Sequence, residues 1–179
     1  KDWHNDRILK DRISRLRKVH EEAGRPFPGV GSRVFEIGCA EGHLLKYLQD
    51  EGADAEGIET GAKLVEYCRG RFGLKVNRST VREWFPEKEA YDTTLAYHVL
   101  EHLEKPSELF RKAYEALRPG GLLFLEVPTP DLPECRILDR WDELHGYGNL
   151  GHLHYFTSKT LPKYFEKFGV KLVGRYEYN

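Results

Sequence analysis

The sequence has few cysteines, no long apolar run and almost no net charge, and each shortage excludes a class of protein. Three widely spaced cysteines without a Cys-x-x-Cys pair argue against a disulfide framework or a cysteine-rich zinc site. No apolar run approaches the roughly 18 residues that span a bilayer, and the polar first residues do not resemble a signal peptide. A net charge of −1 gives no overall field to attract nucleic acid or an anionic membrane. We therefore expect a cytoplasmic protein with no nucleic-acid partner and no stable membrane insertion.

Strand and helix patterns alternate along most of the 179 residues. Apolar residues at helical spacing predict an N-terminal helix over 6–20, and the stretch 25–31, rich in proline and glycine, predicts a linker. We expect strands at 33–37, 54–58, 75–76, 91–97, 122–127 and 170–176, and helices at 42–49, 62–72, 107–117 and 158–168. The long stretch 128–150 predicts an irregular loop, and loops of this length in compact domains commonly have a function.

This alternation predicts the fold class and the organisation of the chain. Strands that alternate with helices specify an α/β domain that is doubly wound and Rossmann-like, a mostly parallel sheet with helices on both faces. We place this domain at residues 32–179, after an N-terminal helix and linker at residues 1–31. Ligands in such sheets bind at the carboxyl ends of the strands.

The loop after the first expected strand has the composition of a cofactor loop. In Gly38-Cys-Ala-Glu-Gly42, two glycines allow backbone N–H groups to approach a ligand at the positive end of the following helix. The next strand ends in Glu59, 21 positions after Gly38, where a carboxylate can accept both hydroxyls of a ribose. A dinucleotide fingerprint, Gly-x-Gly-x-x-Gly, fails because Ala40 and His43 occupy its second and third glycine positions. An NAD-dependent oxidoreductase therefore remains only as an alternative.

Several segments in the expected order resemble class I S-adenosylmethionine-dependent methyltransferases. The pattern Glu36-x-Gly38-x-x-x-Gly42 resembles the first motif of that family, and Glu59 matches its ribose-binding acid. The further matching segments are 91–103, 118–126 and 152–169. The resemblance extends over residues 34 to about 176 and indicates the small-molecule branch, where the chain resembles ubiquinone-type O-methyltransferases.

The resemblance implies S-adenosylmethionine as the cofactor, S-adenosylhomocysteine as the product and a small-molecule methyl acceptor. Oxygen or carbon is favoured over nitrogen as the accepting atom, and we expect a monomer or homodimer. The implied cofactor-binding residues lie at the ends of the first four strands. They are Glu36, Gly38, Cys39, Ala40, Glu41, Gly42, Glu59, Thr60, Thr80, Val81 and Tyr97.

One departure from the family lies after the third strand. Many relatives have Gly-Asp there to hydrogen-bond the adenine amino group, whereas this chain has Ser79-Thr80. Either the Thr80 hydroxyl or the Val81 backbone would then take that role. Because of this departure, a non-catalytic subunit that binds the cofactor is a second alternative.

Histidines at the expected mouth of the site are the candidates for catalysis. Transfer to a hydroxyl is helped by a base with a pKa near neutrality. His98 follows the fourth strand directly, and His152 and His154 can reach the site from a late segment. We expect one of these three histidines to be catalytic.

The stretch His98-x-x-Glu101-His102 also has two metal interpretations. It matches a zinc-peptidase signature, but that signature needs a long helix. Here the stretch directly continues an expected strand, and Pro106 follows soon after. Ubiquinone-type enzymes carry acid-x-x-Glu-His at this place, a motif associated with a divalent cation; His98 replaces the first acid, which weakens binding of Mg²⁺. We therefore expect no metal, with Glu101 and His102 pinning the loop by hydrogen bonds.

Overall fold

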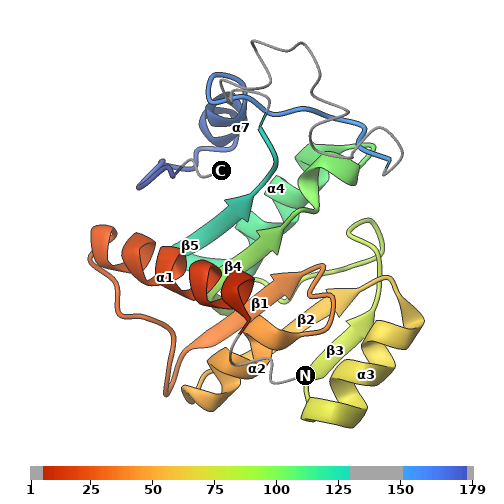
Figure 1. The fold of residues 1–179 in the computed structure, drawn as a ribbon. Coiled ribbons are helices and arrows are strands. Elements are labelled where there is room, and N and C mark those ends of the chain that lie inside the picture. Colours follow the sequence, from red (N-terminus) through yellow and green to blue (C-terminus); the bar gives the residue numbers. More distant parts are fainter. Residues whose placement is uncertain (1–5, 130–150, 177–179) are drawn as a thin grey trace.

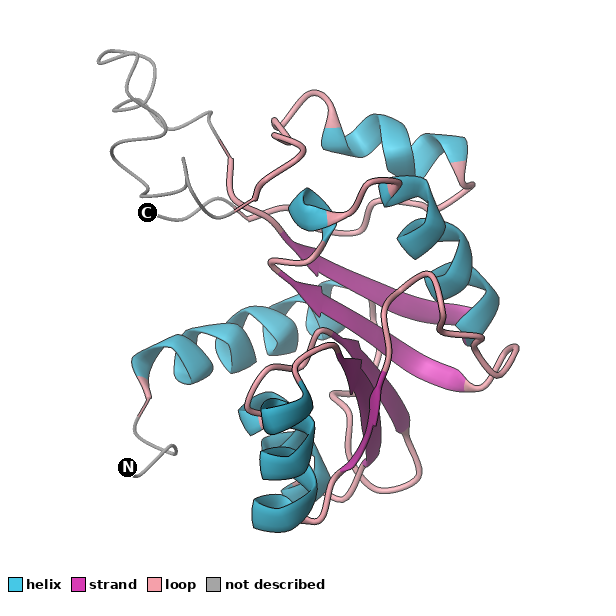
Figure 2. Ribbon diagram, turned by 90° about the vertical axis from the view of Figure 1, so that its right-hand side faces the viewer, coloured by secondary structure: helices cyan, strands magenta, loops and turns pink. Residues whose placement is uncertain are grey.

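A computed structural model describes residues 6–129 and 151–176, and these form a parallel sheet covered by helices on both sides (Figures 1 and 2). The sheet has five strands in the order β3-β2-β1-β4-β5, and every neighbouring pair is parallel. The predicted α/β fold class is therefore confirmed. The strands are β1 (Arg33–Ile37), β2 (Asp54–Glu59), β3 (Lys75–Arg78), β4 (Tyr91–Tyr97) and β5 (Leu117–Glu126).

Local sequence signals account for the start of α1, the start of α4 and the end of α3. Asp6 caps the first helix by accepting a hydrogen bond from the Ile8 backbone at 2.8 Å, Pro106 occupies a first-turn position of α4 as proline prefers, and Gly73 ends α3 in the left-handed conformation. The helical elements are α1 (Arg7–Glu22), α2 (His43–Asp50), α3 (Ala62–Phe72), the 3₁₀ turn η2 (Leu100–His102), α4 (Pro106–Ala116) and α7 (Leu161–Lys167). None of the helices in the described ranges is long and apolar enough to cross a membrane.

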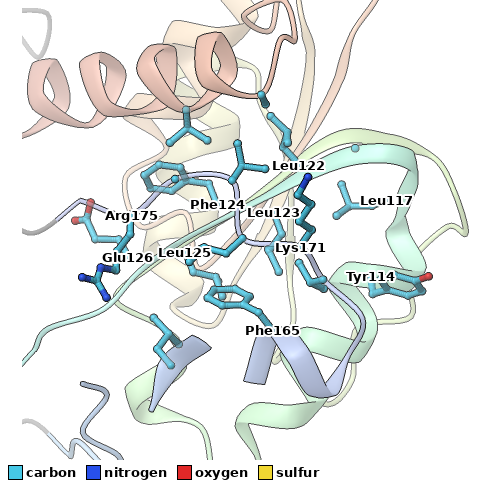
Figure 3. Close-up of a pocket in the computed structure, with 18 of the residues that line it drawn as sticks. Tyr114, Leu117, Leu122, Leu123, Phe124, Leu125, Glu126, Phe165, Lys171 and Arg175 are labelled. Atoms are coloured by element: carbon cyan, nitrogen blue, oxygen red, sulfur yellow. The ribbon is translucent and has the colours of Figure 1, made fainter. Parts of the chain in front are cut away.

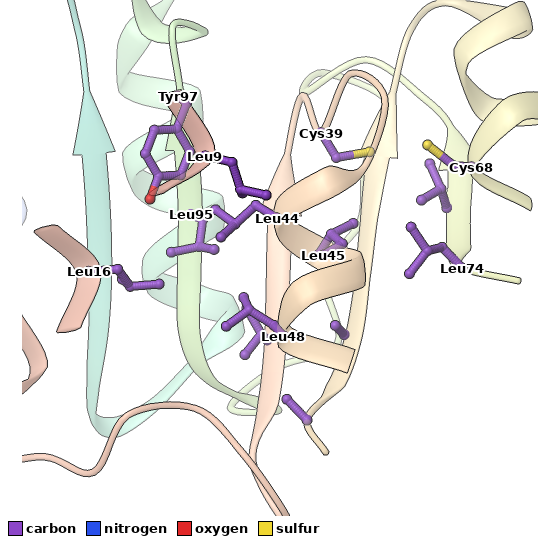
Figure 4. Packing of buried hydrophobic residues seen from close by; sticks show 14 of the residues in the cluster. Leu9, Leu16, Cys39, Leu44, Leu45, Leu48, Cys68, Leu74, Leu95 and Tyr97 are labelled. Atoms are coloured by element: carbon purple, nitrogen blue, oxygen red, sulfur yellow. The ribbon is translucent and has the colours of Figure 1, made fainter. Parts of the chain in front are cut away.

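Two buried clusters cover the two faces of the sheet. On one face, leucines of α1 and α2 pack against Leu95 and Tyr97 of β4, and the sulfur atoms of Cys39 and Cys68 face one another (Figure 4). On the other face, Phe110 of α4 packs with Phe35 and Ile37 of β1 and reaches the α7 side chains. Because period-two alternation sends neighbouring residues of a strand to opposite faces, β1 contributes to both clusters. Helix α1 thus belongs to the same core as the sheet.

The structure corrects several expected boundaries. β3 extends to Arg78, and β5 begins at Leu117, because Leu117 pairs with Tyr91 and an irregular register carries the strand through the Pro-Gly-Gly turn. The helix expected from residue 158 begins at Leu161, because the Thr157 and Thr160 hydroxyls hydrogen-bond the turn that precedes it.

The strand expected at residues 170–176 is wrong. This segment forms no strand, and Leu172 and Val173 remain 45% and 43% exposed. Its alternating apolar residues line the wall of a cavity instead of pairing with β5. Most of the predicted excursion 128–150 lies outside the described residues.

Candidate cofactor site

The loop between β1 and α2 is a tight turn at the carboxyl edge of the sheet. Gly38, Ala40 and Gly42 all have positive φ, at 72°, 48° and 72°. A Cβ atom on Gly38 would lie 2.6 Å from Cγ2 of Val99, and one on Gly42 would lie 2.8 Å from the Cys68 sulfur. The two glycines are therefore required both by backbone conformation and by space. Between them, hydrogen bonding to Cys68 and burial raise the pKa of Cys39, so its thiol stays neutral.

Glu59 holds its carboxylate beside that loop. One carboxylate oxygen accepts hydrogen bonds from the backbone N–H groups of Thr60 and Gly61, at 2.7 and 2.8 Å. The other oxygen accepts from the Ala40 backbone at 3.1 Å. One carboxylate thus connects the end of β2 to the glycine loop by hydrogen bonds. It lies at the carboxyl edge of the sheet, where a ribose would bind. Glu41 and Thr60 are exposed at the same edge.

Three polar side chains converge on the α1 side of β1 and β4. Glu36 is 2% exposed and Tyr97 5%; burial raises the pKa of Glu36 to about 8, partly offset by the positive charge of Arg12. The Arg12 guanidinium lies 4.4 Å from the centre of the Tyr97 ring. Within residues 6–129 and 151–176, Glu36 Oε2 and the Tyr97 hydroxyl are buried without a hydrogen-bond partner.

These unsatisfied atoms fit the amino-acid end of S-adenosylmethionine. Buried polar groups are nearly always hydrogen-bonded in native proteins, so each exception calls for an explanation. An α-ammonium group provides donors for Glu36 and Tyr97, and an α-carboxylate provides a partner for Arg12. The carboxylate of Glu59 lies one strand away, where the ribose would follow.

The loop after β3 does not present the Thr80 hydroxyl as a free partner for the adenine amino group. The Thr80 hydroxyl donates to the Glu83 carboxylate at 2.9 Å and accepts from the Glu83 backbone at 3.2 Å. The hydroxyl is therefore engaged within its own turn. Val81 next to it is buried, which leaves its backbone as the better candidate to recognise an adenine ring.

His98 lies between two carboxylates at the end of β4. Its Nδ1 is 3.3 Å from Glu101 Oε1 and its Nε2 is 3.1 Å from Glu126 Oε1. Hydrogen bonds to Glu101 and then Glu126 raise the pKa of His98 to about 9. His98 is therefore an imidazolium at neutral pH and donates protons in hydrogen bonds. Glu126 is also paired with Arg15 of α1 at 3.1 Å.

The late histidines dock against η2. The backbone N–H groups of Leu153 and His154 donate to the Glu101 carbonyl at 2.8 and 3.1 Å. Burial lowers the pKa of His152, so that imidazole is neutral at pH 7. Its ring centre lies 4.7 Å from that of His102, edge to face, while the His154 ring lies against Phe156. The fold thus brings both His98 and His152 close to the Glu101 carboxylate.

Glu101, His102 and His152 also have the donors of a metal site. Their ligand atoms all lie within 4.8 Å of one another, and two imidazoles with one carboxylate suit zinc or a similar transition metal better than magnesium. Each residue nevertheless has a contact within the fold, as His98 faces Glu101 and the Gly151 carbonyl lies 3.4 Å from His102 Nδ1. The absence of a bound metal stays a prediction.

A cavity of about 1210 Å³ runs along β5, between α1 on one side and α7 with residues 169–176 on the other. Figure 3 shows its mainly apolar wall, formed by Leu123, Leu125 and Phe165, with Glu126 at one end. His98 also lines it. His98, which follows β4, and Glu126, which ends β5, therefore both border this apolar cavity.

Comparison with known proteins decides the family. A family profile described as a methyltransferase domain matches residues 3–174. The chain belongs to the class I S-adenosylmethionine-dependent methyltransferases. The cofactor predicted from the glycine loop is therefore confirmed as that of the family.

The similar proteins include two curated methyltransferases and a solved structure. Over 119 residues, 63% of this chain and 48% of the relative, it is 30% identical to a ubiquinone biosynthesis O-methyltransferase of Cronobacter sakazakii. It is 28% identical to a trans-aconitate 2-methyltransferase of Paracidovorax citrulli, over 71% of this chain and 50% of that protein. The fold matches a methyltransferase structure from Archaeoglobus fulgidus with a TM-score of 0.68 and 23% sequence identity. The match covers 90% of this chain and 68% of that one. The methyltransferase chain thus spans about half the length of these curated relatives.

Sequence reasoning missed Arg12, which lies beside Glu36 and Tyr97 in the candidate cofactor site, and Lys112, which holds the loop after β3. Arg12 belongs to the basic surface of α1, and nothing in its spacing distinguishes it from its neighbours. Lys112 had a usable signal, because it lies three positions after Leu109, on the apolar face of α4. A lysine at such a position is buried only when its charge is satisfied.

Proposed function

We propose that this chain transfers a methyl group from S-adenosylmethionine to a small molecule, at an oxygen or carbon atom. The observation that carries the proposal is the buried pair of Glu36 and Tyr97 with the half-buried Arg12 beside them, one strand from Glu59. An amino-acid end and a ribose end are recognised side by side, as this cofactor requires. A dinucleotide would instead place a pyrophosphate at the loop, where Ala40 and His43 replace the glycines.

The protein's part in the reaction is to bind the cofactor, to orient the acceptor and to take up one proton from it. The cofactor supplies an activated methyl group on its sulfonium, so the chain must align the acceptor and exclude water. Neutral His152 accepts the proton of an acceptor hydroxyl, whereas His98, as an imidazolium, orients the acceptor by donating a hydrogen bond. His154 is the third candidate and faces Phe156 instead.

The acceptor is proposed to have an apolar body and an oxygen or carbon atom that takes the methyl group. One relative is named an O-methyltransferase and another is named for trans-aconitate. The apolar cavity beside His98 favours a hydrophobic acceptor. We propose a monomer or homodimer that acts on such molecules and not on nucleic acid.

Transfer of isotopically labelled methyl groups to a panel of hydroxylated and carboxylated small molecules tests the proposal. With the best acceptor, His152→Gln should lower kcat by about 10²–10⁴-fold, as expected for loss of a general base, while His154→Gln serves as the matched control and stays near wild type. The wild-type rate should rise with pH as His152 loses its proton and then level off, because burial lowers the pKa of His152. Stoichiometric binding of S-adenosylhomocysteine without turnover on any acceptor would instead favour the non-catalytic subunit.

A further inference from the structure

Lys112 of α4 is a buried cation that binds three backbone carbonyls of one loop. The side chain is 4% exposed. Its Nζ donates to the carbonyl oxygens of Val81 at 2.7 Å, Arg82 at 2.7 Å and Trp84 at 2.5 Å. An ammonium group has three N–H donors, so these carbonyls use all of them.

The contacts tie the conformation of the loop to the lysine. A buried charge is costly unless it is fully hydrogen-bonded, and burial lowers the pKa of Lys112 accordingly. The three carbonyls in turn lose their partner if the ammonium is removed, which leaves buried acceptors unsatisfied. A different arrangement of residues 81–84 would therefore break several hydrogen bonds together.

The same loop is fixed from its other side by β1. The Trp84 ring stacks on Phe35 with centres 4.5 Å apart and an angle of 11° between the planes. Phe35 immediately precedes Glu36, and Val81 lies between β3 and Trp84. The loop that follows β3 is thus clamped between the lysine of α4 and an aromatic ring of β1.

We propose that Lys112 is a positioning residue for recognition of the adenine ring. It holds the Val81 carbonyl and so shapes residues 80–84 that the backbone N–H of Val81 is left to recognise the adenine, in place of the side chain that Thr80 does not provide. The proposal rests on the proposed function, since it needs the nucleoside of the cofactor to lie between Glu59 and this loop. Lys112 acts through the loop and does not touch the cofactor.

The test measures affinity for the two ends of the cofactor separately. For Lys112→Met in the full chain, calorimetry should show a Kd about tenfold higher, a difference of 1.4 kcal/mol, for both S-adenosylhomocysteine and 5′-methylthioadenosine, which lacks the amino-acid end. The KM for S-adenosylmethionine should rise by a similar factor while kcat at saturation stays unchanged. Arg111→Ala is the matched control, because Arg111 is the exposed neighbour, paired along the helix with Glu115.

Chemical rescue separates positioning from a general loss of stability. For Lys112→Ala, ammonium chloride should restore the affinity for methylthioadenosine, whereas tetramethylammonium chloride at equal ionic strength should not, because it has no N–H donors. A wild-type Kd in Lys112→Met, with only a lower melting temperature, would overturn the proposal. If that variant does not fold, the absence of any ammonium effect in Lys112→Ala overturns it. Failure of wild-type protein to bind S-adenosylhomocysteine would instead refute the proposed function, and this proposal with it.

Discussion

Alanine at position 38 probes the glycine loop at its tightest point. Gly38 has a φ of 72°, and a left-handed conformation costs a residue with a Cβ about 1–2 kcal/mol. The new Cβ would also lie 2.6 Å from Cγ2 of Val99. Val99 is β-branched and cannot easily turn away, and overpacking of this kind costs about 1–3 kcal/mol. Together, Gly38→Ala should lower the free energy of unfolding by about 2–5 kcal/mol.

Urea unfolding and calorimetry measure the two consequences. Gly38→Ala should lower the unfolding midpoint and raise the Kd for S-adenosylhomocysteine, because the loop must open to accept the Cβ. Adding Val99→Ala relieves the contact but not the backbone strain, so the double-mutant cycle should show a favourable coupling of about 1–3 kcal/mol.

Gly70 provides the matched control. It lies in α3 without a positive φ, and a Cβ atom added there would meet no other atom within 4 Å. Gly70→Ala should therefore raise stability by about 0.5–1 kcal/mol and leave the Kd unchanged. Equal stability of Gly38→Ala and wild type, or zero coupling with Val99→Ala, would refute the reasoning about the loop.

Three further predictions concern the rest of the site. Glu59→Gln should raise the Kd for S-adenosylhomocysteine at least about tenfold, because a charged acceptor of the ribose hydroxyls is lost; an unchanged Kd in calorimetry would contradict that role. The folded-state pKa of His98, about 9, lies above its ordinary value of about 6.5. Its contribution to stability is therefore complete below about pH 6.5 and lost as the pH rises towards 9, a decline in urea unfolding that His98→Gln should flatten. EDTA should leave turnover unchanged, because Glu101, His102 and His152 contact residues of the fold; loss of activity that zinc restores would argue for a metal.

The glycine loop and the sheet could be predicted because their signals are local. Gly38, Gly42 and Glu59 stand at fixed offsets from apolar strands, and strand ends in a parallel sheet share one edge. The strand expected at 170–176 failed because alternation shows which residues share a face but not whether a neighbouring strand is within reach. Its apolar residues face a cavity instead.

The electrostatic properties of the site could not be predicted, because they come from residues far apart in the sequence. The pKa of His98 depends on Glu126, 28 positions away, which no local pattern connects to it. The cation over Tyr97 comes from α1, and the loop after β3 is held by a lysine of α4. Such contacts exist only once the helices have packed on the sheet.

The central claim is that the loop at β1 and the acid at the end of β2 bind S-adenosylmethionine and not a dinucleotide. Calorimetric titration of the folded chain with S-adenosylhomocysteine, and in parallel with NAD, tests it most directly. We predict one S-adenosylhomocysteine bound per chain, with the affinity unchanged by an excess of NAD. No binding of S-adenosylhomocysteine, or its displacement by NAD, would contradict the claim.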